Sequence, residues 1–210
     1  MTKEYFSTRF TEDANRRKVW EKLTPFFQKY INEKDNVVEI GAGYCYFINQ
    51  IKAERKIAVD TFEDLANFTN PDVEPFVKDA RNLKFLSDNS IDVIFASNFL
   101  EHFEWNDLET IGSEFSRVLK INGKIIVMQP NYRLCYKNYF DDFTHRTIFT
   151  DQSLLDWFQS KGFKPEIQMP RFMPFSLKSN FGSLHWLIPL YLRSPLKPLA
   201  GQMMFVFQKK

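Results

Sequence analysis

The chain lacks the features that define several classes of protein. Its two cysteines, Cys45 and Cys135, cannot build a disulfide framework or a thiolate zinc site, so we expect a reducing, cytoplasmic location. No run of about 18 apolar residues is present, and residues 183–192, the nearest approach, are interrupted by Pro189. The first residues have no apolar core like that of a signal peptide. The 28 basic residues nearly balance 26 acidic ones, which argues against a nucleic-acid-binding protein.

The composition that is present suits one folded domain spanning residues 1–210. Hydrophobic residues make up 44% of the chain, which supplies enough apolar surface to offset the entropy of folding. The 23 phenylalanines predict a large core, an aromatic-lined pocket, or both.

Short β-rich runs alternate with helical runs after Asp35. The expected strands are 37–40, 57–60, 75–78, 91–97, 124–130, 163–169 and 202–209. The expected helices are 44–52, a segment near 62–68, 106–120 (ended by Asn122-Gly123) and 151–161, the last with Thr150 as N-cap. This order predicts an α/β fold: a Rossmann-like, seven-stranded, mostly parallel sheet with helices on both faces. Ligands of such sheets bind at the carboxyl ends of the strands.

Two segments lie outside this alternation. Before Asp35, apolar residues recur at helical spacing, and Thr24-Pro25 resembles the start of a second helix, so we expect two helices forming a lid over 1–35. Residues 171–201 form an insertion before the last strand, and they combine apolar and basic side chains: Phe172, Phe175, Phe181, Trp186, Leu187 and Leu190 with Arg171, Lys178, Arg193 and Lys197. Such a mixture recognises an acceptor, makes peripheral membrane contact, or simply completes a pocket or dimer face.

A glycine turn follows the first expected strand. Gly41, Ala42 and Gly43 allow a tight bend and a close approach of the backbone to a ligand. Asp60 ends the second strand, where an acid accepts hydrogen bonds from ribose hydroxyls. Tyr46 stands where a dinucleotide fingerprint has its third glycine, and Glu39 suits a cationic sulfonium and amino group better than a phosphate.

These residues give the sequence a resemblance to the class I methyltransferases that use S-adenosylmethionine. Glu39, Gly41 and Gly43 match the family's first motif, which packs against the methionine part of the cofactor, and Asp60 matches its ribose acid. The resemblance further implies that Asp79, with Ala80 adjoining, lies on the adenine side, that Ser97 and Asn98 end the fourth strand at the cofactor, and that the final strand runs antiparallel to its neighbours. The crowded Tyr44-Cys45-Tyr46, where many members have a further glycine, departs from the pattern.

Three histidines offer a base for the transfer. His145 lies in a polar segment after the fifth strand that resembles a patch in methyltransferases near glycan-biosynthesis enzymes, and Asp141 or Asp142 can orient it. The alternative is that this segment caps the following helix or binds substrate. His102 is expected to pack beneath the cofactor, with Glu101 hydrogen-bonded nearby, and His185 is expected to be a packing or surface residue.

We expect no metal. Asp141, Asp142 and His145 offer suitable ligand atoms, but three groups within five residues can hardly all point inward. The hypothesis is therefore an S-adenosylmethionine-dependent methyltransferase acting on an oxygen of a small molecule or of a glycan or glycan precursor. The alternatives are a NAD-dependent oxidoreductase, disfavoured by the missing third glycine, and a nucleoside-binding module without turnover.

Overall fold

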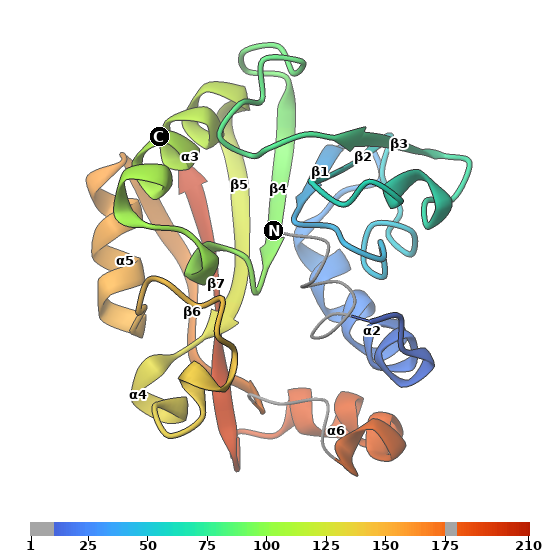
Figure 1. The fold of residues 1–210 in the computed structure, drawn as a ribbon, viewed down its shortest axis with the longest axis vertical. Coiled ribbons are helices and arrows are strands. Elements are labelled where there is room, and N and C mark those ends of the chain that lie inside the picture. Colours follow the sequence, from blue (N-terminus) through green and yellow to red (C-terminus); the bar gives the residue numbers. More distant parts are fainter. Residues whose placement is uncertain (1–10, 175–179) are drawn as a thin grey trace.

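A seven-stranded sheet in the order β3-β2-β1-β4-β5-β7-β6 forms the centre of the molecule (Figure 1). The computed structural model describes residues 11–174 and 180–210, without the side chains of 180–183. The strands are β1 (Asn36–Ile40), β2 (Arg55–Asp60), β3 (Val73–Val77), β4 (Ile91–Ser97), β5 (Leu119–Pro130), β6 (Phe163–Pro174) and β7 (Ala200–Lys209). β1 to β5 pair in parallel, whereas β7 runs antiparallel to both β5 and β6. The predicted mostly parallel sheet and its antiparallel last strand are confirmed.

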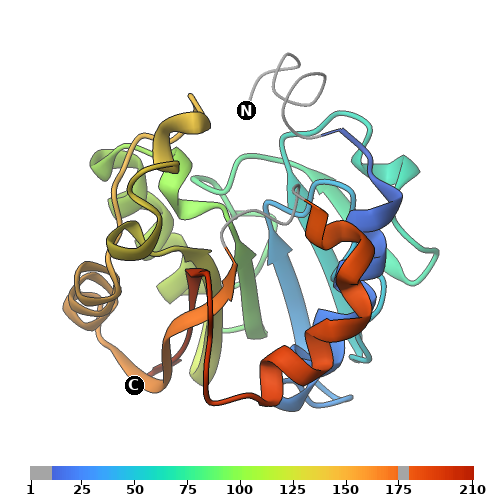
Figure 2. The same cartoon turned by 90° about the horizontal axis from the view of Figure 1, so that it is seen from below.

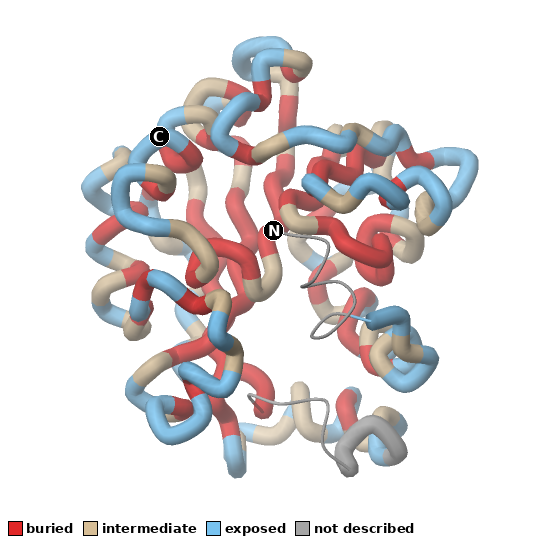
Figure 3. Tube along the Cα trace, in the orientation of Figure 1, coloured by how far each residue is buried: buried red, intermediate tan, exposed pale blue. Residues whose placement is uncertain are grey.

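Helices cover both faces of this sheet, as the alternating pattern predicted (Figure 2). The α-helices are α2 (Ala14–Phe27), α3 (Trp105–Val118), α4 (Tyr132–Cys135), α5 (Asp151–Ser160) and α6 (Ile188–Arg193). The 3₁₀ helices are η1 (Gln28–Tyr30), η2 (Leu65–Asn67), η3 (Leu100–His102), η4 (Tyr139–Asp141) and η5 (Asn180–Leu187). α3 and α5 pack in one core cluster with one face, and α2 packs with α6 and residues 42–51 in the other. The central strands are buried between the two layers (Figure 3).

The expected break at Thr24-Pro25 is wrong, because α2 is one helix that runs through Pro25. Proline removes a backbone donor and usually breaks a helix interior. Here it stands in the last turn, and Leu23 and Phe27 on either side are completely buried against the sheet. Burial of two large side chains therefore outweighs one lost hydrogen bond. Since Val19, Leu23 and Phe27 are core residues, α2 is a fixed layer of the fold; closure of residues 1–35 as a lid stays a prediction.

The helix expected over 44–52 is also wrong, because this segment forms a series of turns. Cys45 has a φ of 56°, a left-handed conformation that an α-helix does not contain. The backbone N–H of Ile48, which a helix would give to Tyr44, donates instead to the Glu39 carboxylate at 3.0 Å. The left-handed Cys45 and the bond from Ile48 N to the Glu39 carboxylate, nine residues away, thus replace the helical pattern that the apolar spacing indicated.

Other boundaries differ by a few residues. The segment near 62–68 holds only the short η2, and β3 begins at Val73. α3 ends at Val118, and residues 119–123 already belong to β5, with Asn122 at a φ of 64° inside a register shift rather than at a helix end. α5 has the expected cap: the Thr150 hydroxyl accepts from Ser153 N, and the Ser153 hydroxyl accepts from Thr150 N in return.

The predicted insertion divides into parts with different roles. Arg171 to Pro174 end β6, and Phe172 is completely buried against α2, so this phenylalanine belongs to the core. η5 and α6 follow, and Trp186 and Leu190 are 63% and 66% exposed. Phe175, Lys178 and the side chain of Phe181 lie outside the described residues.

Candidate functional site

The carboxyl ends of β1 and β2 bring the predicted cofactor residues together. Asp60, the last residue of β2, accepts a hydrogen bond from Gly43 N at 2.8 Å through Oδ2 and one from Phe62 N at 3.0 Å through Oδ1. Gly41 and Gly43 have φ values of 72° and 51°, so the turn needs the left-handed backbone that glycine tolerates. The glycine turn and Asp60, which the sequence predicted to form one site, are thus in direct contact.

Two buried carboxylates line this turn. Glu39 is 5% exposed and Asp60 is 7% exposed. Burial raises the pKa of Glu39 well above its usual value, with a further contribution from the Asp60 charge, and the hydrogen bond from Ile48 N opposes it. Burial also raises the pKa of Asp60, against the hydrogen bonds from Gly43 and Phe62. Each negative charge makes the other carboxylate harder to ionise. A cationic ligand, or one that donates hydroxyl groups, is therefore favourable beside this pair.

The backbone N–H groups of the glycine turn already donate hydrogen bonds within the fold. The helix that the sequence predicted over 44–52 would have offered free N–H groups at its N-terminus, directly behind the glycines. Instead, Gly41 N and Ala42 N donate to Val59 O at 2.9 and 3.2 Å, and Gly43 N donates to Asp60. The turn is therefore held rigidly by β2 and presents carboxylates, not a set of amide donors for a phosphate.

Phe99 is a constituent of the turn that sequence reasoning missed. A Cβ added to Gly41 would lie 2.5 Å from Phe99 Cδ2, closer than a methyl group and an aromatic carbon can approach. This contact needs both a residue without a side chain at position 41 and the ring that follows β4. No local sequence signal marks it, because the two residues meet only through the β1–β4 pairing.

We expect Gly41→Ala to destabilise the fold by about 2–4 kcal/mol, combining the cost of a left-handed alanine with overpacking against Phe99. Urea denaturation would measure the loss. Gly162→Ala is the matched control, since Gly162 has a φ of 85° but no atom within 4 Å of an added Cβ. It should cost only about 1–2 kcal/mol, the backbone part. Equal losses in the two variants would show that the Phe99 contact adds nothing.

The other expected cofactor residues surround the same edge. Asp79 follows β3 and forms an ion pair with Arg81 at 2.6 Å, and hydrogen bonds from Arg81 lower the pKa of Asp79. Ala80 is buried beside it. Ser97 ends β4, and Asn98, at a φ of 48°, donates to the Ser97 hydroxyl and accepts from Gln202 Nε2.

The space beside the turn is filled by the packed side chains of Tyr44, Cys45 and Tyr46. The Tyr44 ring packs against Phe62 at 5.5 Å and Phe68 at 4.7 Å between ring centroids. Tyr46 accepts a hydrogen bond from Asp13 N at 3.0 Å, which ties α2 to the glycine loop. Cys45 is completely buried, and burial together with the charges of Glu39 and Asp60 raises the pKa of its thiol. Cys45 is therefore not a nucleophile.

A second polar cluster lies after β4, where the predicted base is found. The Nδ1 atom of His145 lies 2.7 Å from the carbonyl oxygen of Tyr139. A carbonyl only accepts, so Nδ1 carries the proton and Nε2 carries the lone pair. The His145 and His102 rings are 5.0 Å apart, edge to face. His145 thus lies next to His102, which the sequence analysis assigned to packing beneath the cofactor.

Asp141 and Asp142 take different places. Asp141 is exposed and accepts from Asn138 Nδ2 at 3.1 Å. Asp142 accepts from the Thr144 hydroxyl at 2.6 Å, and that hydroxyl lies 2.9 Å from His102 Nδ1. Burial alone would raise the pKa of Asp142, but the hydrogen bonds from Thr144 and the two imidazoles lower it. Thr144, which sequence reasoning missed, thus links Asp142 to His102, while a backbone carbonyl orients His145.

Burial shifts the proton affinity of the neighbouring groups. It raises the pKa of Glu101 to about 8, with a smaller contribution from Asp142. Burial, followed by the proximity of His145, lowers the pKa of His102 to about 4. His102 is therefore a neutral imidazole near pH 7.

The cluster does not cap the next helix, because Thr150 and Ser153 do.

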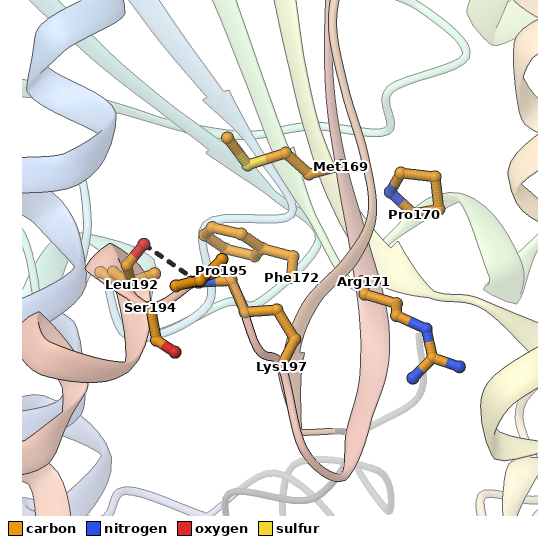
Figure 4. Close-up of a pocket in the computed structure, with 8 residues that line it drawn as sticks. All are labelled: Met169, Pro170, Arg171, Phe172, Leu192, Ser194, Pro195 and Lys197. Carbon is orange, nitrogen blue, oxygen red and sulfur yellow. Dashed lines mark hydrogen bonds between the residues drawn. The ribbon is translucent and has the colours of Figure 1, made fainter.

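A separate groove of about 450 Å³ lies between the end of β6 and the segment after α6 (Figure 4). Its lining residues are Met169, Pro170, Arg171, Phe172, Leu192, Ser194, Pro195 and Lys197. Lys197 Nζ donates to the carbonyl oxygen of Leu192 at 3.0 Å. None of the predicted cofactor or catalytic residues lines this groove, so it belongs to the insertion rather than to the glycine turn.

Comparison with known proteins agrees with this geometry. The family described as "Methyltransferase domain" matches residues 38–127, which include the glycine turn, Asp60 and the polar residues after β4. Residues 38–127 thus match the model of a methyltransferase domain. The prediction of a methyltransferase that uses S-adenosylmethionine as its cofactor is thereby confirmed. No curated protein is similar enough in sequence to match the chain.

Solved methyltransferases have the same fold. A SAM-dependent methyltransferase from Archaeoglobus fulgidus is 21% identical, with a TM-score of 0.69 over 98% of both chains. A SAM-dependent methyltransferase from Thermotoga maritima, described as a possible histamine N-methyltransferase, is 22% identical, with a TM-score of 0.67 over 93% of this chain and 92% of that one. A putative methyltransferase from Haloferax volcanii, solved with the activator Trm112, is 16% identical, with a TM-score of 0.67 over 93% of both chains.

The raised pKa of Glu39 gives a stability prediction. Because the pKa of Glu39 is raised in the fold, folding favours its protonated form, and this contribution is lost as pH rises through the folded-state pKa. We expect Glu39→Gln to raise the free energy of unfolding of the cofactor-free protein by about 1 kcal/mol at pH 8 and by less at pH 5. Urea denaturation at both pH values would measure this.

Glu54→Gln, at an exposed position, is the control for this substitution and should change the free energy of unfolding by less than about 0.5 kcal/mol. The Glu39 variant should at the same time bind S-adenosylmethionine more weakly, because it would lose the charge that the sequence predicts opposite the sulfonium. A variant that is less stable at pH 8 than at pH 5, relative to wild type, would contradict the account of Glu39.

Proposed function

We propose that this methyltransferase transfers its methyl group to an oxygen of a small hydroxylated acceptor, of the glycan or glycan-precursor class. The proposal is supported chiefly by His145, whose Nε2 lone pair is fixed by the Nδ1–carbonyl hydrogen bond at the edge where β4 ends. An alcohol holds its proton tightly, so a positioned base matters more for oxygen than for an amine. S-adenosylmethionine, when bound, supplies a methyl group on a positively charged sulfur.

The protein's part is alignment and proton removal. We infer that Glu39 and the Gly41–Gly43 turn hold the methionine end, that Asp60 accepts hydrogen bonds from the ribose hydroxyls, and that Asp79, Ala80, Ser97 and Asn98 border the adenosine. His145 Nε2 takes the hydroxyl proton while the acceptor oxygen bonds to the methyl carbon. The carbon–sulfur bond breaks, and its electron pair stays on sulfur. One proton and one methyl group are thus exchanged, and the sulfur becomes neutral.

Exposed rings near His145 offer a surface for the acceptor. Tyr136, Phe140 and Phe143 are 56%, 57% and 65% exposed, all within the segment from α4 to His145. Large apolar side chains grouped in this way on a surface mark ligand or partner sites. The glycan class rests on the resemblance of the segment around His145, and the rings are compatible with it.

The insertion is the second surface for recognition. Trp186, Leu190, Leu196 and Leu199 are 63–75% exposed, beside the groove that contains Arg171 and Lys197. We infer that this surface meets either the distant part of the acceptor or a membrane that carries it. Among the described helices, none has the length and apolar character to cross a bilayer. A cytoplasmic location belongs to this proposal, in agreement with two buried, free cysteines.

The test is a screen for S-adenosylhomocysteine release with sugars, sugar nucleotides and lipid-linked sugars as acceptors, and amines as the comparison set. Methylation of hydroxyl acceptors, identified by mass spectrometry, is expected. Transfer to amines alone would overturn the oxygen assignment and leave the methyltransferase in place. Calorimetry with NAD in place of S-adenosylmethionine should give no binding.

A further inference from the structure

Glu101 is a buried carboxylate that neither the cofactor site nor the base accounts for. It lies in η3, directly after β4, and is 0% exposed. Both of its carboxylate oxygens lack a hydrogen-bond partner among residues 11–174 and 180–210. A buried polar group without a partner costs free energy, and native proteins keep such groups mainly for a function.

Two imidazoles lie next to this carboxylate. One ligand atom from each of Glu101, His102 and His145 lies within 4.8 Å of the others. Donor atoms around a bound zinc ion lie about 2.0–2.2 Å from it, and therefore within about 4 Å of one another. An ion would therefore require the three groups to approach one another slightly. Two imidazoles with one carboxylate form a donor set of zinc and of non-haem iron sites.

The outer contacts of the cluster are those of metal ligands. A ligating histidine commonly gives its second ring N–H to a carbonyl, carboxylate or similar acceptor, which fixes the ring. His145 Nδ1 lies 2.7 Å from Tyr139 O, and His102 Nδ1 lies 2.9 Å from the Thr144 hydroxyl, which is held by Asp142. Both rings are therefore held in place through Nδ1.

Backbone bonds hold the two halves of the cluster together. Arg146 N and Thr147 N donate to Glu101 O at 2.8 and 3.1 Å, and the Thr147 hydroxyl donates to Phe103 O at 2.6 Å. The segment that carries His145 is thus fixed on η3, which carries Glu101 and His102. The relative position of the three ligands follows from main-chain bonds and needs no ion to assemble it.

We propose that Glu101, His102 and His145 bind one divalent first-row metal ion, with Zn²⁺ as the probe of choice, at the carboxyl end of β4. The ligand set differs from the group of Asp141, Asp142 and His145 that the sequence suggested and that chain geometry disfavoured. Mg²⁺ is not expected, because it prefers oxygen ligands and near-octahedral water-rich sites.

The consequence for catalysis rests on the proposed function. An ion at this position binds the acceptor oxygen and makes its hydroxyl more acidic, so that the proton leaves to water before the oxygen bonds to the methyl carbon. In the metal-loaded enzyme His145 Nε2 is occupied as a ligand, and activation of the acceptor passes from the imidazole to the ion. His145 remains essential in either case.

Metal binding is measured directly on the full chain. After treatment with a chelator and desalting, calorimetric titration with Zn²⁺ should show one site per chain, and Co²⁺ should give the visible absorption of a bound ion. Mg²⁺ should give neither signal. Glu101→Gln should weaken Zn²⁺ binding by at least about 100-fold, and Thr144→Val, which removes only an outer contact, by about 10–100-fold.

His185→Asn is the matched control, because it removes the chain's third histidine outside the cluster, and Zn²⁺ affinity should stay unchanged. If Glu101→Gln fails to fold, Thr144→Val and His102→Asn carry the test. Zn²⁺ affinity equal in wild type and Thr144→Val, or no binding at one site per chain, would overturn the proposal.

The failure of this proposal is distinguishable from failure of the proposed function. Methyl transfer to hydroxyls that survives chelation, with no Zn²⁺ site, overturns the metal site and leaves the O-methyltransferase with His145 as base. A Zn²⁺ site in a protein that methylates only amines keeps the metal and overturns the oxygen assignment. Loss of turnover on chelation by at least about 10-fold, restored by Zn²⁺, is the expected result.

Discussion

Replacement of His145 by asparagine is expected to lower the rate of methyl transfer by about 10²–10⁴-fold, the usual contribution of a positioned proton acceptor or of the ion it holds. The affinity for S-adenosylmethionine should stay within about twofold of wild type, because a substitution outside the cofactor contacts removes no binding free energy. His145 is held by Tyr139 O and faces His102, not the glycine turn. Rates of S-adenosylhomocysteine formation and calorimetry with the cofactor would separate the two effects.

His185→Asn serves again as the control and should leave the rate unchanged. A His145→Asn enzyme that turns over at the wild-type rate would assign His145 to the scaffold. Loss of cofactor binding in parallel with turnover would show that the substitution disturbs β4 and η3, since Thr147 and Arg146 bond to that segment.

Asp60→Ala is expected to weaken binding of S-adenosylmethionine by about 1–3 kcal/mol, the cost of leaving polar partners unpaired. Two terms contribute. The ribose hydroxyls would lose the acceptor proposed for them, and Gly43 N and Phe62 N would lose the carboxylate that fixes the turn. Asp60→Asn keeps one oxygen as acceptor and should therefore lose less than the alanine variant. Calorimetry with S-adenosylmethionine would measure both.

Asp64→Ala is the matched control, because Asp64 is exposed in the same loop and its side chain makes no capping hydrogen bond. Its affinity for the cofactor should equal that of wild type. Unchanged affinity in Asp60→Ala would remove Asp60 from the cofactor site and leave it with a role in folding only.

The sheet was predictable because its signal is local and repeated. Buried β-rich runs separated by helical runs have few alternatives, and the resemblance added the antiparallel β7. The two wrong helix predictions have a common cause. Over 44–52, the Glu39 carboxylate takes Ile48 N, and in α2 the burial of Leu23 and Phe27 keeps the helix intact through Pro25. In both, a contact distant in sequence overrides a local preference.

The candidate site also has one part that the sequence could predict and one part that it could not. Glu39, the glycines and Asp60 sit at strand ends, so their meeting follows from strand order alone. The cluster of Glu101, His102 and His145 depends on main-chain bonds between η3 and the segment after α4, which no spacing in the sequence specifies. Thr144 and Phe99 were missed for that reason: their importance lies in what the fold places beside them.

A crystal structure of the protein soaked with S-adenosylhomocysteine tests the central claim most directly. The account predicts the ribose hydroxyls within hydrogen-bond distance of Asp60 and the methionine part against the turn formed by Gly41 and Gly43. The nucleoside bound elsewhere, for example in the groove between Arg171 and Lys197, with the glycine turn closed by Phe99, would contradict it.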